Sequence, residues 1–158
     1  MKYNTLGKSD LKVSNYCLGS MTWGESSNEE TGHWQLDTAK DHGINFVDTA
    51  EMYPTNPMRR ETAGKTEEII GNWIKKRRCR DKIVVATKVT GEGSKTVRNG
   101  EPICKNQLVK SVDESLNRLQ TDYIDLYQLH WPNRGSYHFR KYWNYDATYQ
   151  STDEMNDH

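Results

Sequence analysis

The feature that most constrains the fold of this chain is an alternation of short apolar runs with longer segments of helical periodicity. Runs of strand length occur at residues 15–19 ("NYCLG"), 44–48 ("INFVD"), 83–89 ("IVVATKV") and 123–130 ("YIDLYQLH"). The segments between them repeat apolar residues at helical spacing. Strands that alternate with helices of this length are typical of a parallel sheet built from βαβ units. The sequence therefore predicts an α/β fold.

Three helices are predicted between these strands. Ser27 and Glu30 stand at the spacing of a capping box, and Gly43 stands where the first helix would end. Each helix has an apolar face that would pack on the sheet. These faces comprise His33, Leu36 and Ala39 in the first helix, Ile69, Ile70, Trp73 and Ile74 in the second, and Leu108, Val112, Leu116 and Leu119 in the third.

Two segments lie outside this alternation. Residues 2–6 and 11–13 flank the turn-rich stretch "GKSD", which predicts a small N-terminal β-hairpin. At the other end, residues 134–158 have no clear period and finish in polar residues, so they are predicted to be a loop and a poorly ordered tail. All of the predicted βα units therefore fall within residues 1–133.

Composition excludes several classes of partner and site. Lysine plus arginine and aspartate plus glutamate both number 22, so charge gives no reason to expect a nucleic acid or an anionic membrane as partner. Neither an apolar leader nor a membrane-spanning run is evident. The three cysteines form no C-x-x-C pair, which argues against a disulfide framework and a structural zinc site. A reducing compartment fits best, and a cytoplasmic protein is predicted.

Lys88 poses a problem because it lies inside the apolar run "IVVATKV". Burying an ammonium is costly unless a carboxylate meets it. Asp48 closes the preceding apolar run and His130 closes the following one, at the strand ends where parallel α/β folds place their chemistry. We therefore expect Lys88 to pair with Asp48 and the three groups to converge. Singly, each has an ordinary alternative: a turn residue, a lysine that reaches solvent and a packed core histidine.

Tyr53 follows Asp48 by five residues, in the loop after the second strand. A phenol has a pKa near 10 and is a reluctant acid at neutral pH. A desolvated Lys88 beside it would lower that pKa toward the range of a general acid. His130 could then donate a hydrogen bond to a substrate carbonyl oxygen. The alternative for Tyr53 is a packing role.

A metal-dependent hydrolase fits the same residues less well. Asp48 and His130 could ligate an ion, but Lys88 between them would repel it, and the other histidines fall at no ligand spacing. No metal site is predicted.

Three segments together resemble the aldo-keto reductases: "NFVDTAEMYPTNP", "IVVATKV" and "RLQTDYIDLYQLHWP". The resemblance covers roughly residues 1–133, and its most specific element is the ordered set D-x4-Y, then K in the third strand, then H-W-P after the fourth. It implies a (β/α)8 TIM barrel, of which this sequence supplies the first four βα units after an N-terminal β-hairpin.

The resemblance also implies roles for individual residues. Asp48, Tyr53, Lys88 and His130 would form a catalytic tetrad in which Tyr53 protonates the carbonyl oxygen of a small aldehyde or ketone, with hydride supplied by NADPH. The implied cofactor-binding residues are Gly19, Ser20, Met21 and Asp48, and the implied substrate-contacting residues are Trp23 and Trp131. Packing at the barrel rim is an equal alternative for these two tryptophans.

The sequence departs from the family in its extent. A (β/α)8 barrel typically needs about 250 residues, and no stretch like the family's fifth to seventh strands, which hold most of the cofactor, follows residue 133. We therefore expect the N-terminal half of a reductase, a fragment with little activity by itself, whose open sheet edges could self-associate. A non-catalytic nucleotide-binding or regulatory module is the alternative.

Overall fold

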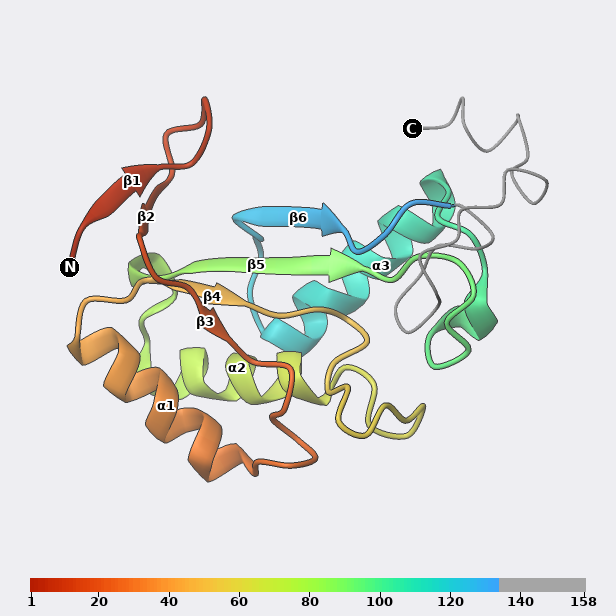
Figure 1. The fold of residues 1–158 in the computed structure, drawn as a ribbon, viewed down its shortest axis with the longest axis horizontal. Helices are drawn as coiled ribbons and strands as arrows, with labels where there is room; N and C mark the ends of the chain where they lie inside the picture. The colour runs from red at the N-terminus through yellow and green to blue at the C-terminus, as the bar shows by residue number, and fades with distance from the viewer. Residues whose placement is uncertain (134–158) are drawn as a thin grey trace.

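A computed structural model describes residues 1–133 of the chain, and the prediction for residues 134–158 lies outside the described part (Figure 1). The main elements are β1 (Tyr3–Thr5), β2 (Lys12–Ser14), β3 (Leu18–Gly19), α1 (Glu29–Asp41), β4 (Phe46–Asp48), α2 (Lys65–Arg77), β5 (Val84–Val89), α3 (Lys105–Leu119) and β6 (Leu126–Leu129). Two short 3-10 helices, Arg80–Lys82 and Arg98–Gly100, precede β5 and α3.

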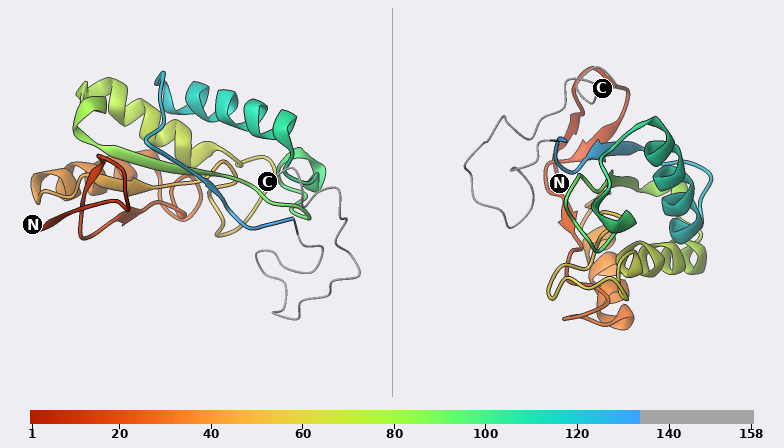
Figure 2. Two further views of the ribbon diagram at one scale, coloured as in Figure 1. Left: turned by 90° about the horizontal axis from the view of Figure 1, so that it is seen from above. Right: turned by 90° about the vertical axis from the view of Figure 1, so that its right-hand side faces the viewer.

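The strands form two sheets. β1 and β2 make a small antiparallel hairpin, and β3, β4, β5 and β6 make a parallel sheet in chain order. Figure 2 shows the three helices on one side of this curved sheet. The predicted α/β class, the parallel sheet and the N-terminal hairpin are confirmed. Because neighbouring parallel strands share one direction, the carboxyl ends of all four strands lie along one edge.

Helix α1 begins one residue later than the predicted capping box. Its N-cap is Asn28, whose side-chain oxygen accepts a hydrogen bond from the Thr31 amide at 2.9 Å, so the assignment of Ser27 as the cap was wrong. Asparagine is as good a cap as serine and stands at the true helix boundary. The predicted end is confirmed, because Gly43 follows the helix with a φ of +81°.

The core lies between α1, α2 and the helix-facing side of the sheet. The expected face of α2 is confirmed, since all four of its apolar residues are at most 4% exposed. α2 and α3 approach closely at Gly71, where an added Cβ would lie 2.3 Å from the Arg118 carbonyl oxygen. On α3 only Leu119 of the expected stripe is fully buried, together with Ser111 and Ser115. The third predicted face was therefore only partly right.

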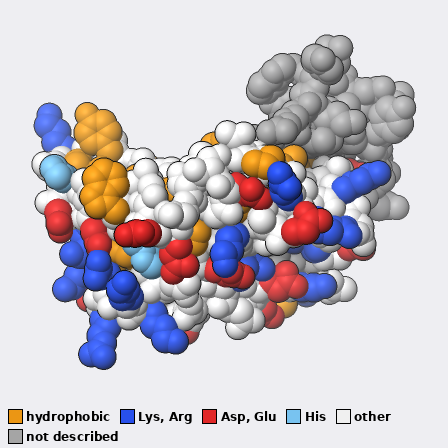
Figure 3. Space-filling view, turned by 90° about the horizontal axis from the view of Figure 1, so that it is seen from below, with side chains coloured by type: hydrophobic (Ala, Val, Ile, Leu, Met, Phe, Trp, Pro, Cys, Tyr) orange, Lys and Arg blue, Asp and Glu red, His pale blue; other side chains and the backbone are white. Residues whose placement is uncertain are grey.

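The outer surface carries charges of both signs. Figure 3 shows lysine and arginine side chains interspersed with aspartate and glutamate over one face. Among the described residues, none of the helices has the length and apolar character needed to cross a membrane.

Candidate active site

Lys88 and Asp48 meet at the carboxyl edge of the parallel sheet. Asp48 is the last residue of β4 and Lys88 the penultimate residue of β5. The Lys88 ammonium donates hydrogen bonds to the Asp48 carboxylate at 2.7 Å and to the Thr49 carbonyl at 2.6 Å. The Lys88 side chain is 12% exposed and that of Asp48 is 32% exposed. The expected pairing is observed, and it supplies the partner that a buried ammonium requires.

Tyr53 is held beside this pair by backbone hydrogen bonds. Its amide donates to the Ala50 carbonyl at 3.0 Å, and its own carbonyl accepts from the Gly64 amide, at the start of α2, also at 3.0 Å. The Lys88 ammonium lies over the phenol ring, 5.2 Å from its centroid. The ring of His130, which directly follows β6, packs edge-on at a centroid distance of 5.6 Å. The four predicted residues are thus brought together.

The expected lowering of the pKa of Tyr53 was wrong. Burial and the negative charge of Asp48 raise the pKa of Tyr53 to about 12. The neighbouring Lys88 ammonium does not reverse this rise. The phenol therefore keeps its proton at neutral pH, which a donor requires, but it is a weaker acid than a free tyrosine.

His130 is neutral at physiological pH. Burial, with the positive charge of Lys88 adding to it, lowers the pKa of His130 to about 4. Its ring also contacts Trp131, at a centroid distance of 5.0 Å. A neutral imidazole next to a protonated phenol can donate one N–H hydrogen bond without carrying a charge.

Three of the residues predicted beside a cofactor lie at the end of β3 or directly after it. Gly19 is exposed and pairs with Asp48 in the sheet register, and an added Cβ there would meet nothing within 4 Å. The Ser20 hydroxyl is buried and donates to the Asp48 carbonyl at 2.7 Å, so it braces the strand end. Met21 is 43% exposed. Gly19 and Met21 therefore border open space beside Asp48.

The two tryptophans lie in different places. Trp23 is 1% exposed, packs in the core and donates its indole N–H to Gln35 at 2.6 Å. This position favours the packing alternative for Trp23. Trp131 instead packs against Tyr53 at the carboxyl edge and donates its indole N–H to the Glu92 carbonyl at 3.0 Å.

Two buried carboxylates escaped the sequence analysis. Glu51 is 2% exposed and bonded to Arg98, and Glu67 is fully buried and bonded to Arg118 at 2.7 Å. Glu67 could have been found, because it shares the helical spacing of the apolar face of α2. Glu51 lies in a loop without periodicity, and its sequence carries no such signal.

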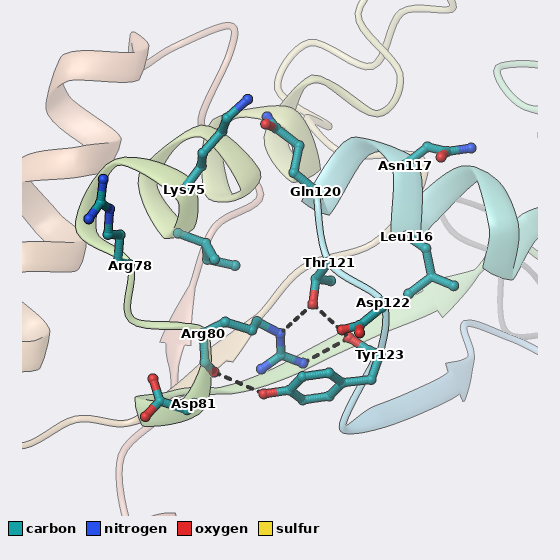
Figure 4. A pocket seen from close by; sticks show the side chains of 11 residues that line it. Lys75, Arg78, Arg80, Asp81, Leu116, Asn117, Gln120, Thr121, Asp122 and Tyr123 are labelled. Carbon is teal, nitrogen blue, oxygen red and sulfur yellow. Dashed lines mark hydrogen bonds between the residues drawn. The ribbon is translucent and has the colours of Figure 1, made fainter.

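A surface cavity of about 720 Å³, drawn in Figure 4, is lined by none of the four candidate catalytic residues. It is lined by residues that precede β5 and β6, at the amino ends of the strands. Arg80 fills its inner side, donating to Thr121 at 3.0 Å and to the Tyr123 carbonyl at 2.9 Å. Within residues 1–133, no group of three or more histidine, cysteine, aspartate or glutamate side chains could hold a metal ion.

Parallel βα units with polar groups gathered at the carboxyl ends of their strands define a partial barrel of the α/β class. The chain belongs to the aldo/keto reductase family, whose sequence profile matches residues 15–158. It is 44% identical over 144 residues to the Tas protein of Escherichia coli and 34% identical over 140 residues to the aldo-keto reductase YhdN of Bacillus subtilis. These matches cover 89% and 84% of this chain.

The chain spans about two fifths of the length of these relatives, 41% of Tas and 39% of YhdN. Among solved structures it is similar to the thermostable aldo-keto reductase Tm1743, crystallised with the inhibitor epalrestat, at 33% identity and a TM-score of 0.64. That match covers 84% of this chain and 44% of the other. The extent agrees with a partial barrel.

Proposed function

We propose that this chain provides the proton-donating half of an NADPH-dependent reductase site that converts small aldehydes or ketones to alcohols. The observation that carries the proposal is the hydrogen-bonded Lys88–Asp48 pair at the strand ends, with the Tyr53 ring beneath the ammonium. Membership in the aldo/keto reductase family supports an oxidoreductase. The proposal adds the cofactor, the substrate class and the role of each residue.

Each residue has a distinct task in this scheme. Tyr53 holds its proton at neutral pH and donates it to the carbonyl oxygen. Neutral His130 donates a hydrogen bond to the same oxygen and so stabilises the charge that develops there. Lys88 and Asp48 fix one another, and the ammonium over the phenol ring favours the phenolate left after proton transfer. A bound nicotinamide would supply the hydride that the carbonyl carbon accepts.

The strand ends of β3 and β4 fit one end of such a cofactor. The Asp48 carboxylate is partly exposed and can accept from a ribose hydroxyl, and Gly19 beside it leaves open space. These two residues would hold the nicotinamide ribose. Aspartate is a suitable acceptor for such hydroxyls because an ionised carboxylate offers several lone-pair positions.

One observation favours a second candidate, a nucleotide-binding module without turnover. The pKa of Tyr53, raised by burial and by Asp48, makes its phenol a poor acid. Both candidates predict that NADPH binds, and only the first predicts that a carbonyl substrate is then reduced.

The test compares this chain alone with a chimera that joins it to the part of the Escherichia coli Tas protein beyond the matched segment. We expect little NADPH oxidation with the chain alone and substantial oxidation with the chimera, using a panel of aromatic aldehydes. In the chimera, Tyr53→Phe should lower kcat by about a hundredfold to ten-thousandfold, as expected for loss of a general acid. NADPH binding, measured by nucleotide fluorescence, should remain nearly unchanged.

The matched control is Tyr123→Phe, which removes a phenol at the amino end of the sheet that donates to the Arg80 carbonyl at 3.3 Å. Its kcat should equal that of the parent chimera. Turnover that survives Tyr53→Phe would exclude Tyr53 as the acid, and binding of NADPH without any turnover by the chimera would favour the second candidate.

A further inference from the structure

Glu51 is a buried carboxylate that joins three segments on the helix side of the sheet. It accepts hydrogen bonds from the Thr90 amide, just after β5, and from the Arg98 guanidinium at 2.5 and 2.7 Å. It also accepts from the Ser111 hydroxyl on α3 at 2.5 Å. Burial acts to raise the pKa of Glu51, but the bonds and charge of Arg98 outweigh it and hold the pKa below its usual value. Glu51 is therefore an anion fixed on several sides.

Arg98 ties the loop between β5 and α3 to this anion. Its side chain is 6% exposed, and its guanidinium also donates to the Thr90 carbonyl at 3.0 Å. Arg98 and the adjacent Asn99 have φ values of +45° and +57°, in the left-handed region that non-glycine residues seldom adopt. Such a backbone persists where its surroundings hold it, and the bonds to Glu51 do so here.

Each member of this ion pair lies close in the chain to a residue of the apolar cluster that contains Tyr53. Glu51 stands two residues before Tyr53 in one loop, and Arg98 adjoins Val97 in the other. Tyr53 and Val97 pack in the same apolar cluster, so the two loops meet both through the ion pair and through apolar contact. The remaining members of the cluster are Ala50, Met52, Met58 and Trp131.

We propose that Glu51, through its ion pair with Arg98, is the positioning residue that holds Tyr53 edge-on to His130. The pair acts by fixing the two loops that meet at the phenol. The proposal rests on the proposed function, because the place of Tyr53 matters only if its phenol reacts. Its test requires no catalytic activity, so the role of Glu51 and the proposed function can be refuted independently.

The pair formed by Glu67 and Arg118 provides a matched control. Its carboxylate is fully buried, its arginine is 21% exposed against 6% for Arg98, and its bond is 2.7 Å long. Glu67 also accepts a hydrogen bond from the Thr87 hydroxyl at 2.5 Å. The groups that bond Glu67 lie on α3 and β5, although the Arg118 side chain also lies against Gly64, whose amide donates to the Tyr53 carbonyl. Breaking this pair should destabilise the protein and disturb Tyr53 less than breaking the Glu51–Arg98 pair.

The experiment is an NMR comparison of Arg98→Met and Arg118→Met in the 158-residue chain. We expect the nuclear Overhauser effect between the Tyr53 and His130 rings to be lost in Arg98→Met and kept in Arg118→Met. Hydrogen exchange at the Tyr53 and Thr55 amides should become about tenfold faster in Arg98→Met than in Arg118→Met, because local opening depends on local contacts. Equal ring contacts and equal exchange in both variants would overturn the proposal.

A milder pair of variants covers the case in which Arg98→Met does not fold. Ser111→Ala removes one hydrogen bond from Glu51, and Ser115→Ala removes the contact of 3.3 Å from Arg118 to the Ser115 hydroxyl. We expect only Ser111→Ala to weaken the ring contact and speed exchange at Tyr53. If Ser111→Ala left both unchanged, Glu51 would be a structural residue alone, whatever the fate of the proposed function.

Discussion

Two acid–base pairs in this molecule share one bond length and differ in surroundings. Lys88 reaches Asp48 at the open strand ends, and Arg118 reaches Glu67 between α2 and α3, both at 2.7 Å. Asp48 is 32% exposed and Glu67 is fully buried. Bond geometry therefore does not distinguish a reactive pair from a structural one. The difference lies in whether an incoming molecule can reach the carboxylate, and only Asp48 is accessible.

The largest effect on stability is expected when the cation of the pair with the buried carboxylate is removed. Arg118→Met leaves Glu67 as an uncompensated charge without exposure to water. We expect the free energy of unfolding to fall by about 3–5 kcal/mol, the usual cost of breaking a buried pair. Urea denaturation measures this loss. A change below about 1 kcal/mol, the value of an exposed pair, would show that the two pairs are energetically alike.

The second prediction concerns pH and the open end of the sheet. His130 has a pKa of about 4 in the folded protein against an ordinary value of 6.5. The unfolded chain therefore takes up the proton first as pH falls, so the stabilisation is complete above pH 6.5 and is lost progressively down to about pH 4. The loss should be on the order of 3 kcal/mol.

Unfolding curves recorded across this pH window measure the loss, and His130→Gln isolates it. The variant should show a smaller fall in stability than the parent protein, because carboxylates contribute equally to both. The same pH dependence in the two proteins would mean that His130 is not buried as a neutral ring.

A third, smaller effect compares packing in the two regions. Gly71→Ala would place a methyl group 2.3 Å from the Arg118 carbonyl oxygen, where backbone must move. Overpacking of this kind costs roughly 1–3 kcal/mol. Gly19→Ala, at the open end of β3, meets nothing within 4 Å and should change stability by less than about 0.5 kcal/mol. Equal thermal midpoints for the two variants would contradict the contrast.

The sequence predicted the sheet, the helices and the meeting of Lys88 with Asp48, because strand period and strand ends are local patterns. Prediction from the sequence failed for side chains whose properties depend on contacts from several segments. The pKa of Tyr53 rises because burial and the charge of Asp48 both act on the phenol, and the sequence alone shows neither the burial nor the balance of the two charges. Glu51 gave no signal, since its partners Thr90, Arg98 and Ser111 lie 39 to 60 residues further along the chain.

The central claim is that the pair with the accessible carboxylate, Lys88–Asp48, serves chemistry and the pair with the buried carboxylate, Arg118–Glu67, serves stability. The most direct test is kcat for aldehyde reduction by the chimera with Tas, measured for Lys88→Met and Arg118→Met at a temperature where both remain folded. We predict that Lys88→Met lowers kcat by about a hundredfold or more, while Arg118→Met keeps kcat within about twofold. Full turnover by Lys88→Met would contradict the account.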